Sequence, residues 1–410
     1  MRNHSNWLEA YIHHTRHSES PTPFHFWTGV STIAGVLQRK VWINQLHFQW
    51  LPNFYIVLVG PPGVAAKSTS VNSGMSLLKR VKGVKMGPPS LTWQALTVEL
   101  ENAAETVVFP NGDKKTSSCL TIPVSELGTF LKPDDDVMNS ILIDIWDGKE
   151  GEWKHATKTT GDTKIMSPWL NIIGCTTPSW MKANFSERIS GGGLSSRIIF
   201  VFGEKKRKLV AYPHLIMNVE QFKIEQDKLV QDLEQIALLK GEFSMTKDAV
   251  EFGTEWYRHL WSGARSEEIT GEKYDDHFAR KQTQAHKLAM IISVAQRDDL
   301  VITKSDLEAA VGMITGLEAD LVSMFNTLTT NPIVRQVQEV IRLMSQHKKM
   351  EYSLLRKIMF ATMSQKELEG AIRDAVSAGY LTCKKDNGVN MVYFNHTPEQ
   401  RSLQSQGIAS

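Results

Sequence analysis

The stretch from residue 54 to residue 69 restricts the possible folds of this chain more than any other segment. Residues 54–59 read Phe-Tyr-Ile-Val-Leu-Val, an apolar run that predicts a short buried strand. A turn sequence, Gly60-Pro-Pro-Gly63, comes next, and Lys67-Ser-Thr69 stands where a helix over 68–81 is predicted to begin. A buried strand that enters a helix through a glycine-rich turn is typical of an α/β domain with a largely parallel sheet.

The same stretch has the composition of a phosphate-binding loop. Glycines let backbone N–H groups surround phosphate oxygens, while a lysine reaches the β- and γ-phosphates and a hydroxyl binds Mg²⁺. The usual pattern is G-x-x-x-x-G-K-[ST]; here Ala65 takes the place of the second glycine and Lys67 lies one residue late. An ordinary strand, turn and helix would explain the glycines but not the Lys-Ser-Thr sequence. We therefore predict a site for ATP and Mg²⁺, with Ser68 as a metal ligand, made of Gly60, Pro61, Gly63, Ala66, Lys67, Ser68 and Thr69.

Length, charge and cysteine content narrow the class of protein. The chain has 410 residues, enough for two or three domains, and its net charge of +2 gives no general attraction for nucleic acid. The three cysteines are far apart and lack metal-ligand spacing, which suits a reducing cytoplasm. No apolar run has the length of a membrane-spanning helix, so we expect a cytoplasmic protein without a membrane partner.

Periodicity along the chain predicts five parts. We expect a helical collar over 1–40, a P-loop ATPase domain over 41–210, a helical lid over 211–330, a winged-helix domain over 331–395 and a disordered tail over 396–410. Buried strands are predicted at 119–124, 169–174 and 198–202. In the winged-helix domain, helices at 334–346, 351–360 and 364–378 precede a hairpin whose Asn-Gly turn lies at 387–388.

An ATPase needs an acidic group beside the phosphates. The strand over 119–124 ends in Ser125-Glu126, and we predict that Glu126 polarises the attacking water and contributes to the metal site. The partner aspartate that usually precedes it is replaced by Ser125. Asp144 is the competing acid, but residues 137–147 have helical spacing behind a natural cap, which places Asp144 on a helix surface.

Three further segments carry candidate residues. The strand over 169–174 continues into Thr176-Thr-Pro178, where a polar side chain could lie near the γ-phosphate, or where the chain simply leaves the sheet. Arg197 follows a glycine-rich segment and precedes the next strand; it could complete a neighbouring subunit's site, with Arg188 as the alternative, or it could be an ordinary surface arginine. A hairpin between Trp153 and Thr160 could present Lys154, His155 and Lys158 to DNA phosphates, or could be a solvated arm.

The order of these parts resembles the AAA+ ATPases, in particular the branch with a hairpin before the sensor-1 strand. That branch includes the superfamily III viral helicases and the minichromosome-maintenance helicases, and the chain is also similar to replicative helicases of phages and plasmids. The resemblance rests on residues 60–69, Ser125-Glu126, the Lys154-His155 hairpin, Thr176-Thr-Pro178 and Arg197, and on the segments 52–55, 193–197, 280–281 and 286–290. It covers roughly residues 20 to 320.

The resemblance implies a role for each matching position. Lys67 and Ser68 would bind phosphate and Mg²⁺, and Glu126 would be the Walker B acid. Thr177 would be the sensor-1 residue, Arg197 the arginine finger and Arg280 a sensor-2 arginine in the lid. Lys154 and His155 would contact DNA at the hairpin tip. Such proteins work as rings, so the resemblance also implies a homo-oligomer, typically a hexamer.

Three functions follow as hypotheses. The first is a ring-forming, ATP-dependent DNA helicase or translocase of phage or plasmid replication, which moves single-stranded DNA through a central pore with its hairpins. The second is an initiator or helicase loader in which ATP acts as a switch. The third is a DNA-binding regulator with a degenerate P-loop. In each, the winged helix could bind DNA through Lys384 and Lys385 or dock a replication partner protein.

Overall fold

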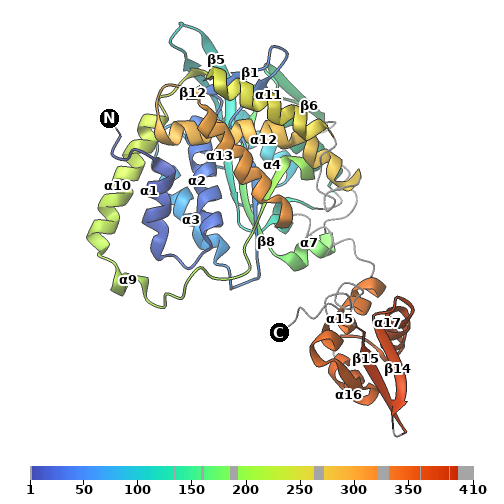
Figure 1. Cartoon of the computed structure of the whole chain (residues 1–410). Helices are drawn as coiled ribbons and strands as arrows, with labels where there is room; N and C mark the ends of the chain where they lie inside the picture. The colour runs from blue at the N-terminus through green and yellow to red at the C-terminus, as the bar shows by residue number, and fades with distance from the viewer. Residues whose placement is uncertain are drawn as a thin grey trace. The chain divides into compact units, whose positions relative to one another are not determined.

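The computed structural model describes residues 2–132, 135–157, 161–184, 193–262, 272–320, 332–360, 362–386 and 388–395. These residues belong to two compact units, 1–324 and 325–410 (Figure 1). The predicted collar, ATPase domain and lid all lie in the first unit, and the predicted winged helix lies in the second.

A five-stranded sheet forms the centre of the first unit. Its strand order is β4-β5-β8-β3-β9, and β5, β8, β3 and β9 are parallel while β4 runs antiparallel to β5 at one edge. The bounds of these strands are β3 Tyr55–Val59, β4 Ala104–Val108, β5 Lys114–Val124, β8 Trp169–Thr176 and β9 Ile198–Phe202. The predicted strands are therefore confirmed, and the unit has an α/β architecture with a mainly parallel sheet.

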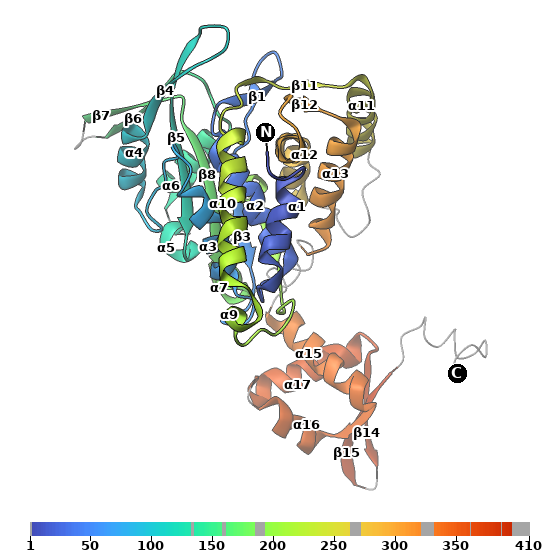
Figure 2. The ribbon, with the colours of Figure 1, turned by 90° about the vertical axis from the view of Figure 1, so that its left-hand side faces the viewer.

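Helices cover both faces of this sheet (Figure 2). On one face lie α1 (Trp7–His14), α2 (Thr22–Leu37), α3 (Lys67–Leu78), α10 (Val219–Ile236) and α12 (Glu272–Gln296). The other face carries α4 (Trp93–Asn102), α5 (Leu127–Phe130) and α6 (Asp136–Trp146). The prediction of a helix over 137–147 is confirmed, and Asp135 caps it by accepting a hydrogen bond from the Met138 amide.

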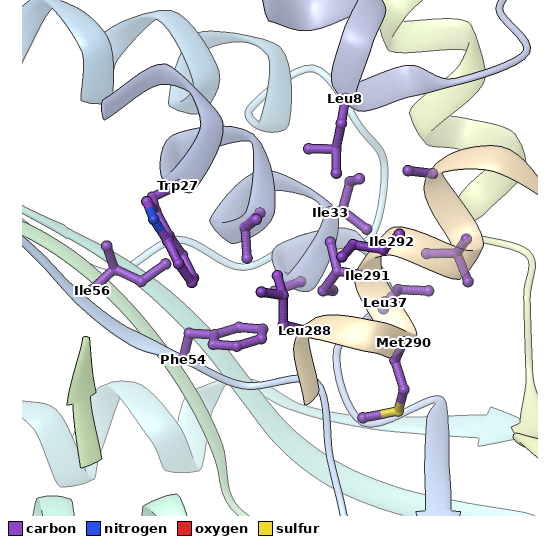
Figure 3. Close-up of a cluster of buried hydrophobic side chains, with 14 of the residues drawn as sticks. Leu8, Trp27, Ile33, Leu37, Phe54, Ile56, Leu288, Met290, Ile291 and Ile292 are labelled. Carbon is purple, nitrogen blue, oxygen red and sulfur yellow. The ribbon is translucent and has the colours of Figure 1, made fainter. Parts of the chain in front are cut away.

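Helix α2 is part of the core instead of a peripheral collar. Most of its residues are buried, and Trp27, Ile33 and Leu37 pack against Phe54 and Ile56 at β3. Figure 3 shows that Leu288 and Ile291 of α12 fill the same cluster. Burial of a large apolar side chain contributes about 1.5–3 kcal/mol, so these contacts join the N-terminal helices, the sheet and α12 into one folding unit.

Shorter elements complete the first unit. Strands β1 (Val41–Asn44), β2 (Gln49–Trp50) and β10 (Gly241–Glu242) form one small sheet, and β11 (Ser244–Met245) pairs with β12 (Val301–Ile302). The hairpin β6 (Glu152–Thr157) and β7 (Gly161–Met166) follows α6. The remaining elements are η1 (Thr15–His17), α7 (Pro178–Asn184), η2 (Ser195–Arg197), α9 (Pro213–Ile216), α11 (Lys247–Trp261) and α13 (Lys304–Gly316).

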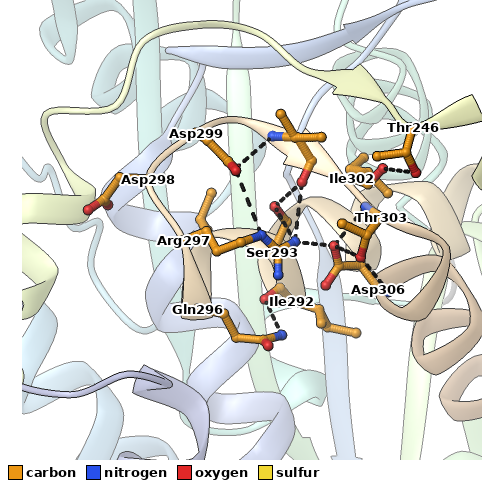
Figure 4. A network of polar contacts seen from close by, with 12 residues as sticks. Thr246, Ile292, Ser293, Gln296, Arg297, Asp298, Asp299, Ile302, Thr303 and Asp306 are labelled. Atoms are coloured by element: carbon orange, nitrogen blue, oxygen red, sulfur yellow. Dashed lines mark hydrogen bonds and ion pairs between the residues drawn. The ribbon is translucent and has the colours of Figure 1, made fainter.

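A polar network fastens the end of α12 to the start of α13 (Figure 4). Arg297 donates hydrogen bonds to Asp306, and to the Val301 carbonyl at 3.3 Å. Asp306 also accepts from the Thr303 amide at 2.8 Å, which closes a capping box at the first turn of α13. This network fixes how the two helices meet.

The second unit combines three helices with a small sheet. Its elements are α15 (Pro332–His347), β13 (Lys349–Glu351), α16 (Tyr352–Met359), α17 (Gln365–Ser377), β14 (Leu381–Asp386) and β15 (Val389–Phe394). The sheet order is β13-β15-β14, all antiparallel, and Gly388 in the turn before β15 has a positive φ of 85°. The predicted helices and hairpin are confirmed, whereas β13 was not predicted because it is only three residues long.

Candidate functional site

The loop between β3 and α3 lies at the carboxyl edge of the central sheet. Gly60 leaves β3 and donates a backbone hydrogen bond to the Thr176 carbonyl of β8 at 3.3 Å. On the other side, the Gly203 amide, just after β9, donates to the Val59 carbonyl at 2.9 Å. The loop therefore starts between two neighbouring strands and ends at Lys67, the first residue of α3.

Three positions of this loop have demanding backbone geometry. A Cβ atom at Gly60 would lie 2.4 Å from the Gly203 carbonyl oxygen, so no larger residue fits. Gly63 has a φ of +69° and Ala66 a φ of +46°, both in the left-handed region. Ala66, and not Ala65, thus occupies the left-handed position before the lysine, while Ala65 is fully buried. Matching the sequence to the usual pattern put Ala65 in place of the second glycine. In the structure, Ala66 is the residue with the backbone conformation that favours glycine.

Lys67 extends back into its own loop. Its Nζ donates hydrogen bonds to the Gly60 carbonyl at 2.6 Å and to the Pro61 carbonyl at 3.1 Å. Partial burial lowers the pKa of Lys67, and the nearby Cys175 opposes that shift. Ser68 and Thr69 are exposed on the first turn of α3, where backbone N–H groups are not used by the helix. A lysine and two hydroxyls therefore surround the helix start.

Cys175 connects the loop to β8. Its thiol hydrogen-bonds with Ser68, and burial raises its pKa to about 11, with the Lys67 charge acting in the opposite direction. The side chain is thus a neutral, buried thiol beside the lysine. No feature of the sequence pointed to this contact, because Cys175 has the appearance of an ordinary core residue.

Strand register puts Glu126 at the same edge as the loop. Val124 pairs with Gly174, and Gly174 pairs with Val57, so these three residues lie at one level of the sheet. Glu126 comes two residues beyond Val124 and is exposed. It therefore lies at the level of Val59, the last residue of β3. Since β8 separates β5 from β3, the backbones are about 10 Å apart. A glutamate can reach across much of that gap.

The two threonines at the end of β8 have different environments. The hydroxyl of Thr177, the predicted sensor, accepts a hydrogen bond from the Trp180 amide at 3.1 Å and so caps α7. Thr176 is 2% exposed, and its hydroxyl oxygen has no hydrogen-bond partner among the described residues. Of the two side chains, Thr176 is the one with an unused polar atom at the sheet edge.

Arg197 and Arg280 do not lie near this loop. Ile198, the first residue of β9, pairs with Tyr55, the first residue of β3, so Arg197 lies at the amino edge of the sheet. It is 6% exposed and donates to both oxygens of Asp147, at 3.0 and 3.2 Å. Arg280 lies 3.6 Å from Asp147. Strand β3 alone separates the two edges by roughly 13 Å.

This placement differs from the predicted roles of both arginines. A nucleotide contact by Arg280 requires the carboxyl edge, and an arginine finger requires an exposed guanidinium. The sequence could not show that Asp147 is the common partner of the two arginines, because Asp147 is fifty positions before Arg197.

The β6–β7 hairpin is anchored at its base. Trp153 donates from Nε1 to Asp144 at 2.5 Å, and Lys149 donates to the same carboxylate at 2.5 Å. Asp144 is therefore a structural partner on α6, as its helical position predicted. Lys154 forms an ion pair with Glu152 at 3.2 Å. The side chain of His155, and all of Lys158 and Arg188, lie outside the described part of the chain.

A pocket next to the start of α3 was not foreseen. It has a volume of about 440 Å³, and its walls include Ala66, Thr69, His14, His25 and Phe222. His14 stacks on Phe222 with 4.2 Å between ring centroids. Burial lowers the pKa of each of these histidines to about 4, so both rings are neutral at pH 7. The pocket is thus an apolar, aromatic space beside the β3–α3 loop.

In the second unit, Lys384 and Lys385 are exposed on β14, opposite Met391 and Asn390 of β15. Their ammonium groups are available to a partner surface.

Comparisons with known proteins leave the family open. The chain matches no protein-family model, and no curated protein has significant sequence similarity to it. Within the described ranges, no helix has the length and apolar character needed to cross a membrane. The same residues contain no group of three or more His, Cys, Asp or Glu side chains able to hold a metal ion.

Proposed function

We propose that this protein binds and hydrolyses ATP at the β3–α3 loop, and that it is a ring-forming DNA helicase or translocase of the AAA+ type. The observation that carries the proposal is the position of Lys67, whose ammonium group lies inside a glycine-containing loop at the start of a helix. When a phosphate binds, the Lys67 ammonium group would donate to it instead of to the Gly60 and Pro61 carbonyls. Two neutral acceptors would thus be replaced by a charged one.

The strand order gives further support. One strand, β8, lies between the loop strand β3 and the strand β5 that ends at Glu126. This order brings an acid, a threonine hydroxyl and the phosphate loop to one edge, as in AAA+ ATPases. Glu126 would accept a proton from water, and Thr176 replaces Thr177 as the better sensor candidate because its hydroxyl has no partner among the described residues.

Two cofactors belong to this proposal. The triphosphate would lie along the loop, and its base would enter the pocket beside α3, where His14 and Phe222 present an aromatic wall. Mg²⁺ neutralises charge on the β- and γ-phosphates, and the oxygens of Ser68 and Glu126 are the ligand type that it prefers. Both residues are exposed at the carboxyl edge, so they fit this role.

The DNA-related part of the proposal rests on other features. The β6–β7 hairpin is the candidate pore element, and a hexameric ring is what the AAA+ resemblance implies. In the second unit, the order helix, strand, helix, helix, strand, strand is typical of a winged helix, with Lys384 and Lys385 on the wing. These features support DNA in a central pore and a DNA or protein contact through the winged helix.

A second candidate function is an ATP-dependent switch, such as an initiator or helicase loader. Two observations favour it: Ser125 stands where an aspartate usually supports Mg²⁺, and Ala66 stiffens the loop in a strained conformation. Both would slow hydrolysis more than binding.

The test compares Lys67→Ala with Lys79→Ala, a matched variant of an exposed lysine at the other end of α3. We expect the wild type and Lys79→Ala to bind ATP with equal affinity and to hydrolyse it faster with single-stranded DNA. Lys67→Ala should bind ATP at least tenfold more weakly, because a charge-assisted hydrogen bond to phosphate contributes about 1.5–3 kcal/mol. ATP binding without DNA-stimulated turnover would favour the switch. A wild type that does not bind ATP would refute both functions.

A further inference from the structure

The amino edge of the central sheet contains a second, larger cleft, with a volume of about 760 Å³. We call it the amino-edge cleft. The β1–β2 loop, the segment after α6 and the first half of α12 surround it. Its walls include Arg39, Phe48, Trp146, Asp147, Arg280 and Lys287. These residues come from four separate parts of the sequence, and no motif marks them.

Lys287 lies at the inner wall of this cleft, and its acceptors among the described residues are all neutral. It is 2% exposed, and its Nζ donates to Asn53 Oδ1 at 2.8 Å. The same Nζ lies 3.6 Å from the centre of the Trp146 ring, a close cation–π contact. Burial lowers the pKa of Lys287, and Asp147 only partly opposes that effect. A nearby anion would stabilise its charged form.

Two further donors at the cleft are not fully used. Arg39 donates from Nη1 to the Pro168 carbonyl at 3.3 Å, while its buried Nη2 has no acceptor among the described residues. Trp146 is 2% exposed, and its indole Nε1 likewise has no acceptor within that part of the chain. A buried donor without a partner is unfavourable, so groups of this kind are normally satisfied by a ligand or ordered water.

Two acids line the cleft, Asp147 and Glu150. Asp147 accepts two hydrogen bonds from Arg197 and lies 3.6 Å from Arg280, so its carboxylate is turned toward those two arginines. Glu150 forms an ion pair with Lys115 at 3.0 Å. Burial lowers the pKa of Arg39, and Glu150 only partly opposes that effect. Buried cations need a counter-charge, which at this cleft can come from solvent through its open side.

The rim of the cleft is apolar and aromatic. Phe48 is 55% exposed and Leu46 is 87% exposed, both on the loop between β1 and β2. Phe48 packs beside Trp50, with 6.0 Å between ring centroids. An exposed aromatic ring next to cationic groups is the usual arrangement for stacking a nucleobase while its phosphate is bound.

We propose that the amino-edge cleft binds the phosphate and base of a nucleotide unit, with Arg39 and Lys287 at the phosphate and Phe48 against the base. The unit could be part of a single-stranded nucleic acid or a free nucleotide, since the chemistry recognised is the same. The site is separate from the β3–α3 loop, so the proposal does not depend on ATP hydrolysis there.

The test uses full-length protein carrying Lys67→Ala, which removes the lysine of the other candidate site. Binding of a fluorescein-labelled oligothymidylate is followed by anisotropy, and binding of ATP by calorimetry.

We expect Arg39→Gln to weaken binding of one of these ligands about tenfold, Arg39→Lys to restore part of it, and Arg80→Gln to have no effect. Arg80 is a suitable control because it is exposed and paired with Asp227. Weaker binding of the oligonucleotide by Arg39→Gln would mean that the cleft binds single-stranded nucleic acid. Weaker binding of ATP would mean that it binds a free nucleotide.

Phe48→Ala provides a second measurement in case Arg39→Gln fails to fold, because its exposed ring can be removed without opening the core. It should weaken the same ligand at least threefold. If neither ligand binds the Lys67→Ala protein, or if both affinities are unchanged in folded Arg39→Gln and Phe48→Ala proteins, the proposal is wrong.

Discussion

The two edges of the central sheet hold their positively charged side chains in different ways. At the carboxyl edge, Lys67 is held by two carbonyls of its own loop, and the hydroxyls and acid around it are exposed. At the amino edge, Arg197 is buried and bound to Asp147, and Lys287 lies against the Trp146 ring at the inner wall of the amino-edge cleft. The lysine of the carboxyl edge is partly exposed in its loop, whereas both cations of the amino edge are buried.

This difference explains why one edge has a recognisable motif and the other has none. The residues of the proposed phosphate site are consecutive, as expected of a site that is formed by the backbone of a single turn. The amino-edge residues are held together only by the sheet and by α12. A contiguous site can thus be found from sequence, while an assembled site cannot.

The largest expected effect concerns catalysis at the carboxyl edge. Glu126→Gln should lower ATP turnover by at least about 100-fold, because general-base groups typically contribute 10²–10⁴. The free energy of unfolding should be unchanged, since Glu126 is exposed, and ATP affinity should fall much less than turnover. Phosphate release and calorimetry measure the two quantities. Asp144→Asn is the matched control, and a loss of turnover in that variant with full activity in Glu126→Gln would mean that the acid is assigned wrongly.

The next effect concerns stability at the amino edge. Arg197→Ala should lower the free energy of unfolding by about 1.5–3 kcal/mol, because it removes a buried guanidinium that donates two hydrogen bonds to Asp147 and leaves that carboxylate with Arg280 alone. Arg80→Ala, at an exposed ion pair, should cost less than about 1 kcal/mol. Urea titration measures both. If Arg197→Ala is as stable as the wild type but loses turnover, and mixing with wild-type subunits restores it, then Arg197 acts as a finger after all.

The smallest effect concerns the loop backbone. Ala66→Gly should raise the free energy of unfolding by about 1 kcal/mol, because alanine is strained in the left-handed region and glycine is not. Ala65→Gly, one residue earlier, should instead be destabilising because Ala65 is fully buried. Chemical denaturation of both variants compares them directly. Equal effects of the two substitutions would show that the strain at Ala66 is not real.

Much of the architecture could be predicted because its signals are local. Apolar runs identified β3 and β9, helical spacing after an acidic cap sequence identified α6, and the Asn-Gly turn identified the last hairpin. The predictions that failed concern side chains far from their partners. Arg280 was expected near the nucleotide because it lies in a helix of the predicted lid, yet it contacts Asp147 at the other edge.

The amino-acid sequence alone determined that the chain contains an α/β unit in which a buried strand enters a helix through a glycine-containing loop, since periodicity and turn residues act over a few neighbouring positions. Only the tertiary structure decided which polar groups share an edge of the sheet. Strand order and register set those neighbours, and they depend on how α2 and α12 pack across the sheet. That packing is why Glu126 lies level with the loop and why Arg39, Trp146 and Lys287 meet in one cleft.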